Sequence, residues 1–428
     1  MTKSPPVTIK PSMNIYAIII FLYIALSAIH VPIFGPFYAE DCLAPIIAVL
    51  LLARRPSLRH PIFLPLLLLA AITAIHFLQG GENAYNLAVL VYLAGLYLFA
   101  RQTNPSKKAM AICGGVLLSL FIIGWIGDAV AFLLFQIRDT GLVFLGDDVA
   151  QTENLSFLAR RYAFLFGNPN ILGSFYVLPM LLFLRGLEEK AHSFDWKKWL
   201  LLLAFLPLSL LPLVSTFSKH AIMTGAVILA FFANCLQDKF PRLVRSFWLP
   251  ILLVGLVCET TVLFVTFPVK STPPFINTTT GMYAIHQTIY ARMPFTSPSA
   301  WLVGSSPAKI RQLYPTLADV RSIRRTLLQY NALDNLEMFS TFMDPHNEYL
   351  NLAAFYGVPA LAVIVAFFIV FALRNCHSRY VTCFFLAFAF ACLWDDLLSK
   401  RWICLTFAFL PCSETPLTST TTGPCISQ

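Results

Sequence analysis

Charged residues are scarce in this sequence. They account for 12% of its 428 residues, against 58% for hydrophobic residues, and the mean hydropathy is +0.72. Soluble domains carry about 25% charged residues, so this composition excludes a soluble globular protein and predicts an all-α polytopic membrane protein. The net charge of +9 does not then indicate a nucleic-acid partner, because basic residues in such proteins mostly lie in cytoplasmic loops and set the orientation. Membrane lipids are the expected surroundings.

Cysteine motifs are also missing. The ten cysteines include no Cys-x-x-Cys pair and no paired Cys/His spacing, and most of them fall inside apolar segments. This pattern supports neither a disulfide framework nor a zinc site. We therefore expect isolated thiols, no metal and no cofactor.

Apolar runs of roughly bilayer length recur along the chain and predict twelve transmembrane helices in a single domain covering residues 1–428. No small-residue cleavage site follows the first run, which indicates a retained span and not a signal peptide. The one large loop outside the membrane covers residues 268–345, and the Thr/Ser-rich residues 413–428 are expected to form a disordered cytoplasmic tail. The predicted spans are 15–34, 42–53, 61–78, 84–100, 109–135, 169–185, 199–214, 217–236, 247–267, 347–373, 379–394 and 400–412.

Lysine and arginine are absent from the first two outer loops if the N-terminus is cytoplasmic, which agrees with the positive-inside rule. Both termini are then cytoplasmic. Spans six, eight, ten and twelve run from the outside to the inside, so their N-terminal ends share the outer face. The remaining outer cations lie in the large loop or before these spans, and cations that oppose the charge bias need another explanation. Those before the spans are Arg138, Arg160, Arg161, Lys219, Lys400 and Arg401.

The start of span ten has the residues of a strong helix N-terminus. Asp344 can cap the helix, and Pro345 suits its first position because the missing N–H would be unpaired there anyway. His346 and Asn347 would lie in the first turn, where the helix dipole favours an anion and disfavours a protonated imidazole. A neutral His346 beside an anion pocket is a candidate general base, although the same residues also suit an ordinary helix start at a membrane surface.

The starts of spans six and eight carry related chemistry. Asn168 can cap a helix whose first turn holds a proline and Asn170, and Arg160 and Arg161 come shortly before. The connection before span eight is so short that Lys219 must lie at the membrane surface, where a charge is costly without a partner or a water-filled cavity. Cations, several helix N-termini and a base on one face are what binding of a pyrophosphate requires.

Each of these features also has a plainer interpretation. The arginines and the lysine can be interfacial anchors that reach lipid phosphates. In residues 394–401, Asp395 and Asp396 with Lys400 and Arg401 favour a simple surface ion-pair cluster. Residues 310–336 place arginines at helical spacing among leucines, which predicts an amphipathic helix on the membrane surface. It is either a lid over a lipid-linked substrate or a solvated basic face near anionic lipids.

Four segments together resemble a known family. Residues 344–350, Asp-Pro-His-Asn-Glu-Tyr-Leu, followed by Gly357, resemble the His-Asn segment of the O-antigen ligase and polymerase superfamily, which ends a large periplasmic loop and begins a late transmembrane helix. Arg161 with residues 167–170 is similar to that family's arginine and Gly-x-Pro-Asn segment. Residues 216–219 are similar to its Thr-x-Ser-Arg segment, and residues 304–306 occupy the place of its Gly-x-Gly turn. The resemblance covers about residues 155–400.

The resemblance implies transfer of a glycan from an undecaprenyl pyrophosphate carrier on the periplasmic side of a Gram-negative inner membrane, without a metal or a nucleotide sugar. The family's essential histidine falls on His346, which would take a proton from an acceptor hydroxyl as it attacks the anomeric carbon with inversion. Its pyrophosphate-binding arginines fall on Arg161 and in the large loop. The expected substrate-binding residues are Arg161, Arg160, Lys219, Asn347, Arg292 and Asn170.

The chain departs from the family at several positions. Lys219 stands where arginine is usual, which keeps the charge but loses the bidentate fork. His220 replaces a glycine, Ala360 stands near an expected second glycine, and Arg292 is the nearest substitute for an arginine early in the loop.

Several functions stay open at this point. The leading one is an O-antigen ligase with lipid A-core oligosaccharide as acceptor, followed by a polymerase that joins lipid-linked repeat units. A protein-glycosylating ligase is less expected, because such members usually continue into an added C-terminal region. A secondary transporter would also place charges among many spans, but here the ionisable residues gather at one face and no inverted repeat is evident.

Overall fold

The computed structural model describes most of the chain outside the termini and the longer connections. The described residues are 15–34, 37–54, 63–78, 84–103, 105–137, 139–144, 161–166, 168–216, 218, 220–265, 286–318, 321, 324, 328, 346–393, 395, 397–398 and 400–411. Asp344, Pro345, Arg160 and Lys219 lie outside them, as do the predicted tail and much of the large loop.

The described chain is built almost entirely of α-helices, as predicted, and each predicted apolar run contains at least one. The helices are α1 Ile15–Ile29, α2 Ala44–Arg54, α3 Phe63–Leu78, α4 Ala84–Thr103, α5 Lys107–Phe135, α7 Pro169–Phe175, α8 Val177–Ala191, α9 Trp196–Val214, α10 Ala221–Leu236, α11 Pro241–Val265, α13 Pro298–Val303, α14 Pro307–Leu317, α17 Glu348–Tyr356, α18 Val358–Arg374, α19 Arg379–Ala391 and α20 Arg401–Phe409.

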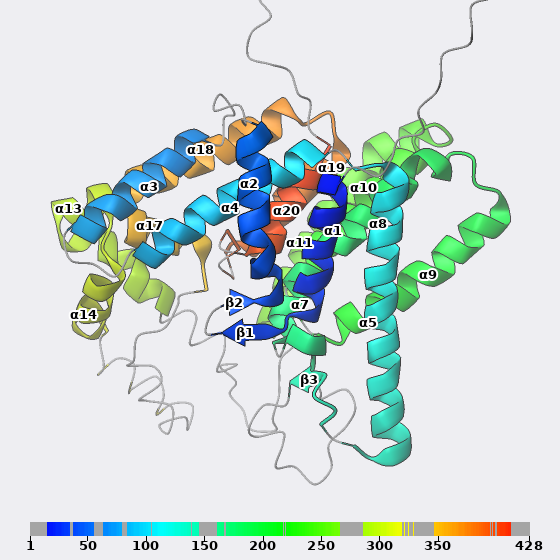
Figure 1. The fold of residues 1–428 in the computed structure, drawn as a ribbon, viewed down its shortest axis with the longest axis horizontal. Coiled ribbons are helices and arrows are strands. Elements are labelled where there is room, and N and C mark those ends of the chain that lie inside the picture. Colours follow the sequence, from blue (N-terminus) through cyan, green and yellow to red (C-terminus); the bar gives the residue numbers. More distant parts are fainter. Residues whose placement is uncertain are drawn as a thin grey trace, which may run out of the picture.

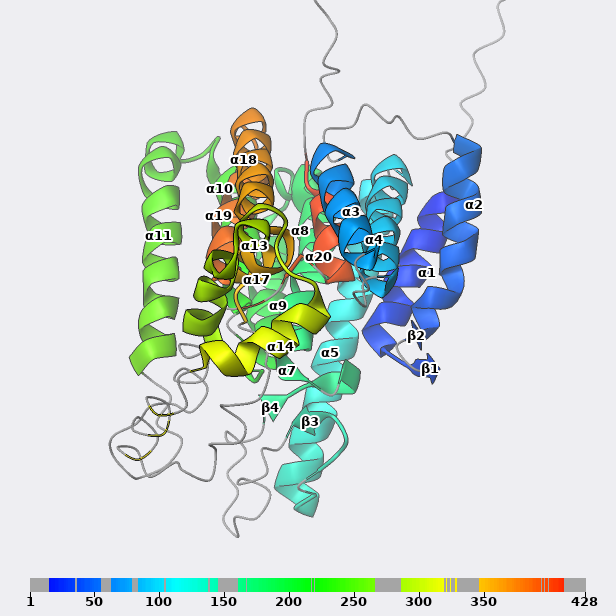
Figure 2. The same cartoon turned by 90° about the vertical axis from the view of Figure 1, so that its left-hand side faces the viewer.

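Short elements connect some of these helices. There are 3-10 turns at η1 Ala39–Leu43, η3 Phe164–Phe166 and η4 Met293–Thr296. The strands within the described residues form two small antiparallel hairpins, β1 Pro32–Phe34 with β2 Phe37–Tyr38, and β3 Val143–Phe144 with β4 Arg161–Tyr162. Both hairpins lie with α7 and α14 at one end of the helical bundle (Figure 1, Figure 2).

Helix length and composition fit a membrane protein. Among the described residues, four helices are long and apolar enough to cross a bilayer, namely Lys107–Phe135, Pro169–Ala191, Trp196–Val214 and Pro241–Cys258. Several other apolar helices are shorter than the ~20 residues that a perpendicular span needs. The nine residues of α20 rise only about 14 Å, so this helix cannot cross a bilayer about 30 Å thick by itself.

The core runs through α8, which packs against α5, α10 and α20. Almost every α8 side chain between Val177 and Leu184 is buried, because α8 has neighbours on all sides and no face left for lipid. An aromatic cluster joins α18, α19 and α20 through Phe368, Phe384 and Phe407. These contacts hold the short helix α20 inside the bundle.

Predicted span ten is broken at a glycine. α17 ends and α18 begins at Gly357, whose φ of 86° and ψ of 163° form a backbone conformation that is essentially restricted to glycine. Gly304, at the end of α13, has φ 73° and ψ −158°. A Cβ on Gly304 would lie under 3.0 Å from the backbone of Phe355 and Tyr356, and one on Gly357 equally close to the backbone of Leu302. The two glycines therefore let the large loop pack directly on the α17–α18 joint.

The predicted amphipathic helix is interrupted at Ala318, whose backbone leaves the helical region. α14 covers Pro307–Leu317, and of residues 319–336 only Arg321, Arg324 and Leu328 are described, all of them helical. Residues 286–292 are also helical and share a small core with α14 and α17, formed by Tyr290, Tyr314 and Ala354 among others. The described part of the large loop is thus a small helical unit attached to α17.

Replacement of Gly357 by alanine should destabilise the protein by about 2–5 kcal/mol, because the new methyl group meets backbone atoms and the positive φ is strained. The measurement is thermal or denaturant unfolding of the purified protein in detergent. Gly127→Ala in α5 is the control, because a Cβ there meets nothing within 4 Å and alanine favours a helix by about 0.5–1 kcal/mol. Equal unfolding midpoints for the two variants would contradict the close contact between α13 and the α17–α18 joint.

Candidate functional site

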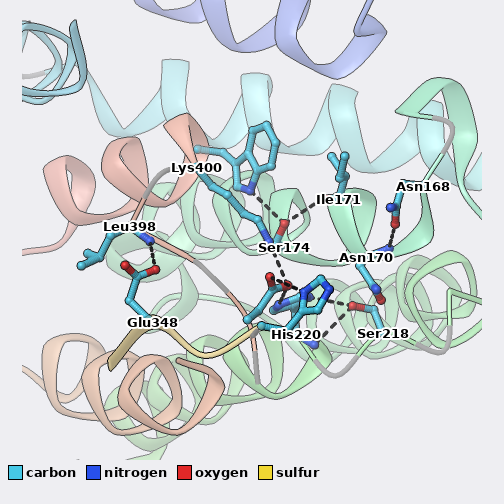
Figure 3. A network of polar contacts seen from close by, with 12 residues as sticks. Asn168, Asn170, Ile171, Ser174, Ser218, His220, Glu348, Leu398 and Lys400 are labelled. Atoms are coloured by element: carbon cyan, nitrogen blue, oxygen red, sulfur yellow. Dashed lines mark hydrogen bonds and ion pairs between the residues drawn. The ribbon is translucent and has the colours of Figure 1, made fainter. Parts of the chain in front are cut away.

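The starts of α10, α17 and α20 meet at one buried carboxylate. Asp395, in the connection between α19 and α20, is 5% exposed. Its Oδ2 lies 2.7 Å from His220 Nε2 and 2.8 Å from Lys400 Nζ, and its Oδ1 lies 4.0 Å from His346 Nδ1. Figure 3 shows Ser218, His220 and Lys400 gathered at this point, with Asn168 and Asn170 of the α7 start nearby. We call Asp395, His220, Lys400 and His346 the Asp395 cluster.

Asp395 is ionised in this setting. Burial by itself raises the pKa of a carboxyl group, but the charge and hydrogen bond of His220, together with His346 and the charge of Lys400, outweigh it and hold the pKa of Asp395 well below its ordinary value. Of the ion-pair cluster expected in residues 394–401, the pair between Asp395 and Lys400 forms, but the expected surface position is wrong because Asp395 is buried. Asp395 is internal, and Arg401 does not bind it but pairs with Glu40 at 3.1 Å and Asp41 at 2.7 Å.

His346 has the most exposed side chain of the four residues in the Asp395 cluster. Its side chain is 33% exposed, whereas that of Asp395 is 7% exposed. The backbone φ at His346 is 47°, a value that few residues other than glycine adopt and that often marks a functional position. His346 is thus a partly exposed imidazole whose Nδ1 lies towards the carboxylate of Asp395.

The start of α17 differs from the prediction. The helix begins at Glu348 and Asn347 is its N-cap, with the Asn347 side-chain oxygen accepting a hydrogen bond from Leu350 N at 3.1 Å. His346 thus precedes the helix and does not lie in its first turn. The reason is that Asn347 caps as well as Asp344, while the positive φ at His346 is incompatible with continuing the helix in the N-terminal direction.

The residues after His346 fasten it to the connection that carries Asp395. Asn347, predicted to bind substrate, is 8% exposed, and its amide donates to Leu393 O at 3.1 Å. Glu348 N donates to Cys392 O at 2.8 Å, and Leu398 N donates to Glu348 Oε2 at 3.1 Å. Asn347 therefore has a structural role, because its oxygen and its nitrogen both bind the protein.

Arg161 lies between two of the predicted helix starts. Its Nε donates to Thr216 O at 3.0 Å and its Nη2 to Asn170 Oδ1 at 3.1 Å. β4 is held there because Tyr162 N also donates to Ser215 O at 2.9 Å. The structure thus brings Arg161 and Asn170 to the turn between α9 and α10, which continues to His220 and so to Asp395.

The α7 start forms as predicted. Asn168 is the N-cap, with its side chain accepting from Asn170 N at 2.8 Å, and Pro169 occupies the first turn. Small residues follow on the side facing the cluster. Gly173 has no room for a Cβ because Ser218 packs against it, and Ser174 accepts a hydrogen bond from Trp402 Nε1 at 3.0 Å. This small-residue surface lets the α9–α10 turn and α20 approach α7.

The remaining predicted residues stand apart or outside. Arg292 is exposed at the start of η4, and none of the described contacts of the Asp395 cluster includes it. Arg160 and Lys219 lie outside the described residues. Sequence reasoning did not select His220, Asp395 or Lys400 as site residues. The available signal was a carboxylate and a lysine between two apolar runs, since ionisable residues in such places are rarely left without a partner.

Comparisons of the chain with protein-family models, curated proteins and solved structures found no match. Within the described ranges, no group of three or more His, Cys, Asp or Glu side chains is arranged to hold a metal ion.

Replacement of Asp395 by asparagine should cost about 3–5 kcal/mol of stability, because it leaves Lys400 without its buried partner. It should also change how the free energy of unfolding depends on pH in the acid range. Asp395 has a lowered pKa in the folded protein, so it stabilises the fold above its unfolded pKa of about 3.9 and loses this effect as the pH falls through its folded pKa. Unfolding in detergent at pH 3–7 measures both effects. Asp238→Asn, at a side chain 79% exposed, is the control. If the free energy of unfolding of the Asp395 variant falls with decreasing pH as it does in the wild type, the lowered pKa of Asp395 is contradicted.

Proposed function

We propose that the protein is a glycosyltransferase of the O-antigen ligase type that acts at the periplasmic face of the bacterial inner membrane. The donor is a glycan on undecaprenyl pyrophosphate, and the acceptor is lipid A-core oligosaccharide. The observation that carries the proposal is the placement of His346, a partly exposed imidazole with a carboxylate facing its Nδ1. The same histidine carries the family resemblance of the sequence.

His346 would act as the general base. With the Nδ1–H towards Asp395, Nε2 accepts the proton of the acceptor hydroxyl as the hydroxyl oxygen attacks the anomeric carbon. The bond from that carbon to the pyrophosphate oxygen breaks, and undecaprenyl pyrophosphate leaves with the bonding electrons. Attack opposite the leaving group inverts the configuration. Asp395 would stabilise the imidazolium that forms, since its Oδ1 lies 4.0 Å from Nδ1 and needs only a small approach to make a hydrogen bond.

Cations at the same face would stabilise the departing pyrophosphate. The guanidinium group of Arg161 donates to Thr216 O and to Asn170 Oδ1, which fixes its plane. A preorganised cation in a poorly hydrated site stabilises developing negative charge more than a mobile one does. We assign this role to Arg161 together with Lys219, which lies outside the described residues. The twelve-span topology and the outer position of the large loop belong to the same proposal.

His346→Ala should lower glycan transfer by about 100- to 10,000-fold, the usual contribution of general acid–base catalysis. The measurement is electrophoresis of lipopolysaccharide from a strain that lacks the gene and carries the wild-type or variant copy. His377→Ala, at an exposed histidine between α18 and α19, is the matched control and should leave the polysaccharide ladder unchanged.

Membrane levels of both variants must equal those of the wild type. A normal ladder in the His346 variant would refute the proposal. Lipopolysaccharide bearing single repeat units on deletion of the gene would instead indicate a polymerase, whereas polymer left on the carrier supports the ligase.

A further inference from the structure

A second imidazole lies behind the proposed base. His220, in the turn between α9 and α10, is 0% exposed, and its Nε2 lies 2.7 Å from Asp395 Oδ2. We infer that His220 is a positioning residue that fixes the Asp395 carboxylate so that its other oxygen faces His346. This inference rests on the proposed function of His346.

The two carboxylate oxygens have separate partners. His220 and Lys400 both contact Oδ2, whereas Oδ1 faces His346. A carboxylate bound by only one flexible side chain can rotate about its terminal bond, which is soft in aspartate. Two donors on one oxygen, arriving from the starts of α10 and α20, remove this freedom. The orientation of Oδ1 towards His346 follows from them.

The proton on His220 is also determined. Asp395 is ionised, and an Nε2 without hydrogen at 2.7 Å from its Oδ2 would set two lone pairs against each other, so the Nε2 of His220 carries hydrogen. The other ring nitrogen, Nδ1, lies 2.8 Å from Ser218 Oγ. Ser218 is held in turn because its N–H donates to Thr216 Oγ1 at 3.0 Å and its side chain packs against Gly173. A bond to the second ring nitrogen is the usual way in which a protein fixes the orientation of an imidazole.

Burial separates the roles of the two histidines. A side chain that is 0% exposed does not reach a substrate, so His220 acts through Asp395 and not on the acceptor or the carrier. A purely structural role, in which His220 only stabilises the start of α10, is the competing explanation. The two explanations predict different results once Asp395 no longer acts. Substitution of a positioning residue then has no further effect on transfer, whereas substitution of a structural residue still lowers it.

The test is a double-mutant cycle of His220 and Asp395 in transfer assays with the full-length protein in vesicles. His220→Leu removes the donor while keeping bulk, and His220→Gln keeps an N–H that reaches the position of Nε2. We expect His220→Leu to lower kcat by about 10- to 100-fold, as loss of a residue that orients a reactive group commonly does, with little change in KM. His220→Gln should restore most of kcat. In the Asp395→Asn background, His220→Leu should lower kcat by less than about 2-fold further.

Thr224→Val is the matched control, since Thr224 is 0% exposed, lies one turn further along α10, and its hydroxyl has no hydrogen-bond partner among the described residues. It should leave kcat within about 2-fold of wild type. The inference is overturned if His220→Leu behaves like Thr224→Val, or if its effect is equally large in the Asp395→Asn background. If His346→Ala retains full transfer, the proposed function fails and this inference fails with it. If only the His220 cycle gives the contrary result, the proposed function stands.

Discussion

The arrangement of the site depends on one constraint, the burial of an ionised carboxylate. Removing a carboxylate from water is costly unless its oxygens find charged or hydrogen-bonding partners. Asp395 finds them at His220 and Lys400, which come from the starts of two different helices. The positions of α10 and α20 are therefore tied to Asp395. Because His346 faces the remaining oxygen, the start of α17 is included in the same set of contacts.

The large loop is attached to this arrangement through backbone groups. Leu393 O, two residues before Asp395, accepts from Asn347 Nδ2 at 3.1 Å and from Gln287 Nε2 at 3.4 Å. Residues 286–292 share their small core with α17, and Gly304 packs on the α17–α18 joint. The described part of the loop therefore supports the His346 segment as a fixed neighbour. A rigid surrounding of this kind is what holds a residue at a strained backbone position.

Much of the helical architecture could be predicted from the sequence, because apolar runs bounded by polar turns leave few alternatives. The shared face of four helix starts could also be predicted, since the cations at residues 161, 219, 400 and 401 opposed the charge bias. The cap at Asn347 could not, because Asp344 and Asn347 are equally good caps and the backbone at His346 decides between them. The burial of Asp395 was also beyond the sequence, since it is set by tertiary packing.

The two neighbouring cations of α20 show how tertiary packing decided their roles. Lys400 and Arg401 look equivalent in sequence, but consecutive residues at a helix start point in different directions. Lys400 faces Asp395, and Arg401 faces Glu40 and Asp41, which are about 360 residues away in the chain. At the other end of α20, Arg101 donates to Leu410 O at 2.9 Å and Arg185 donates to Phe409 O.

These guanidinium groups bind carbonyl groups that the helix itself leaves unpaired, at the end where its dipole favours positive charge. A helix too short to cross the membrane is thus fastened at both ends and along its aromatic side. Lys400 is the N-cap of this helix, so the contacts that hold α20 in place also hold the positive charge that balances the buried carboxylate of Asp395.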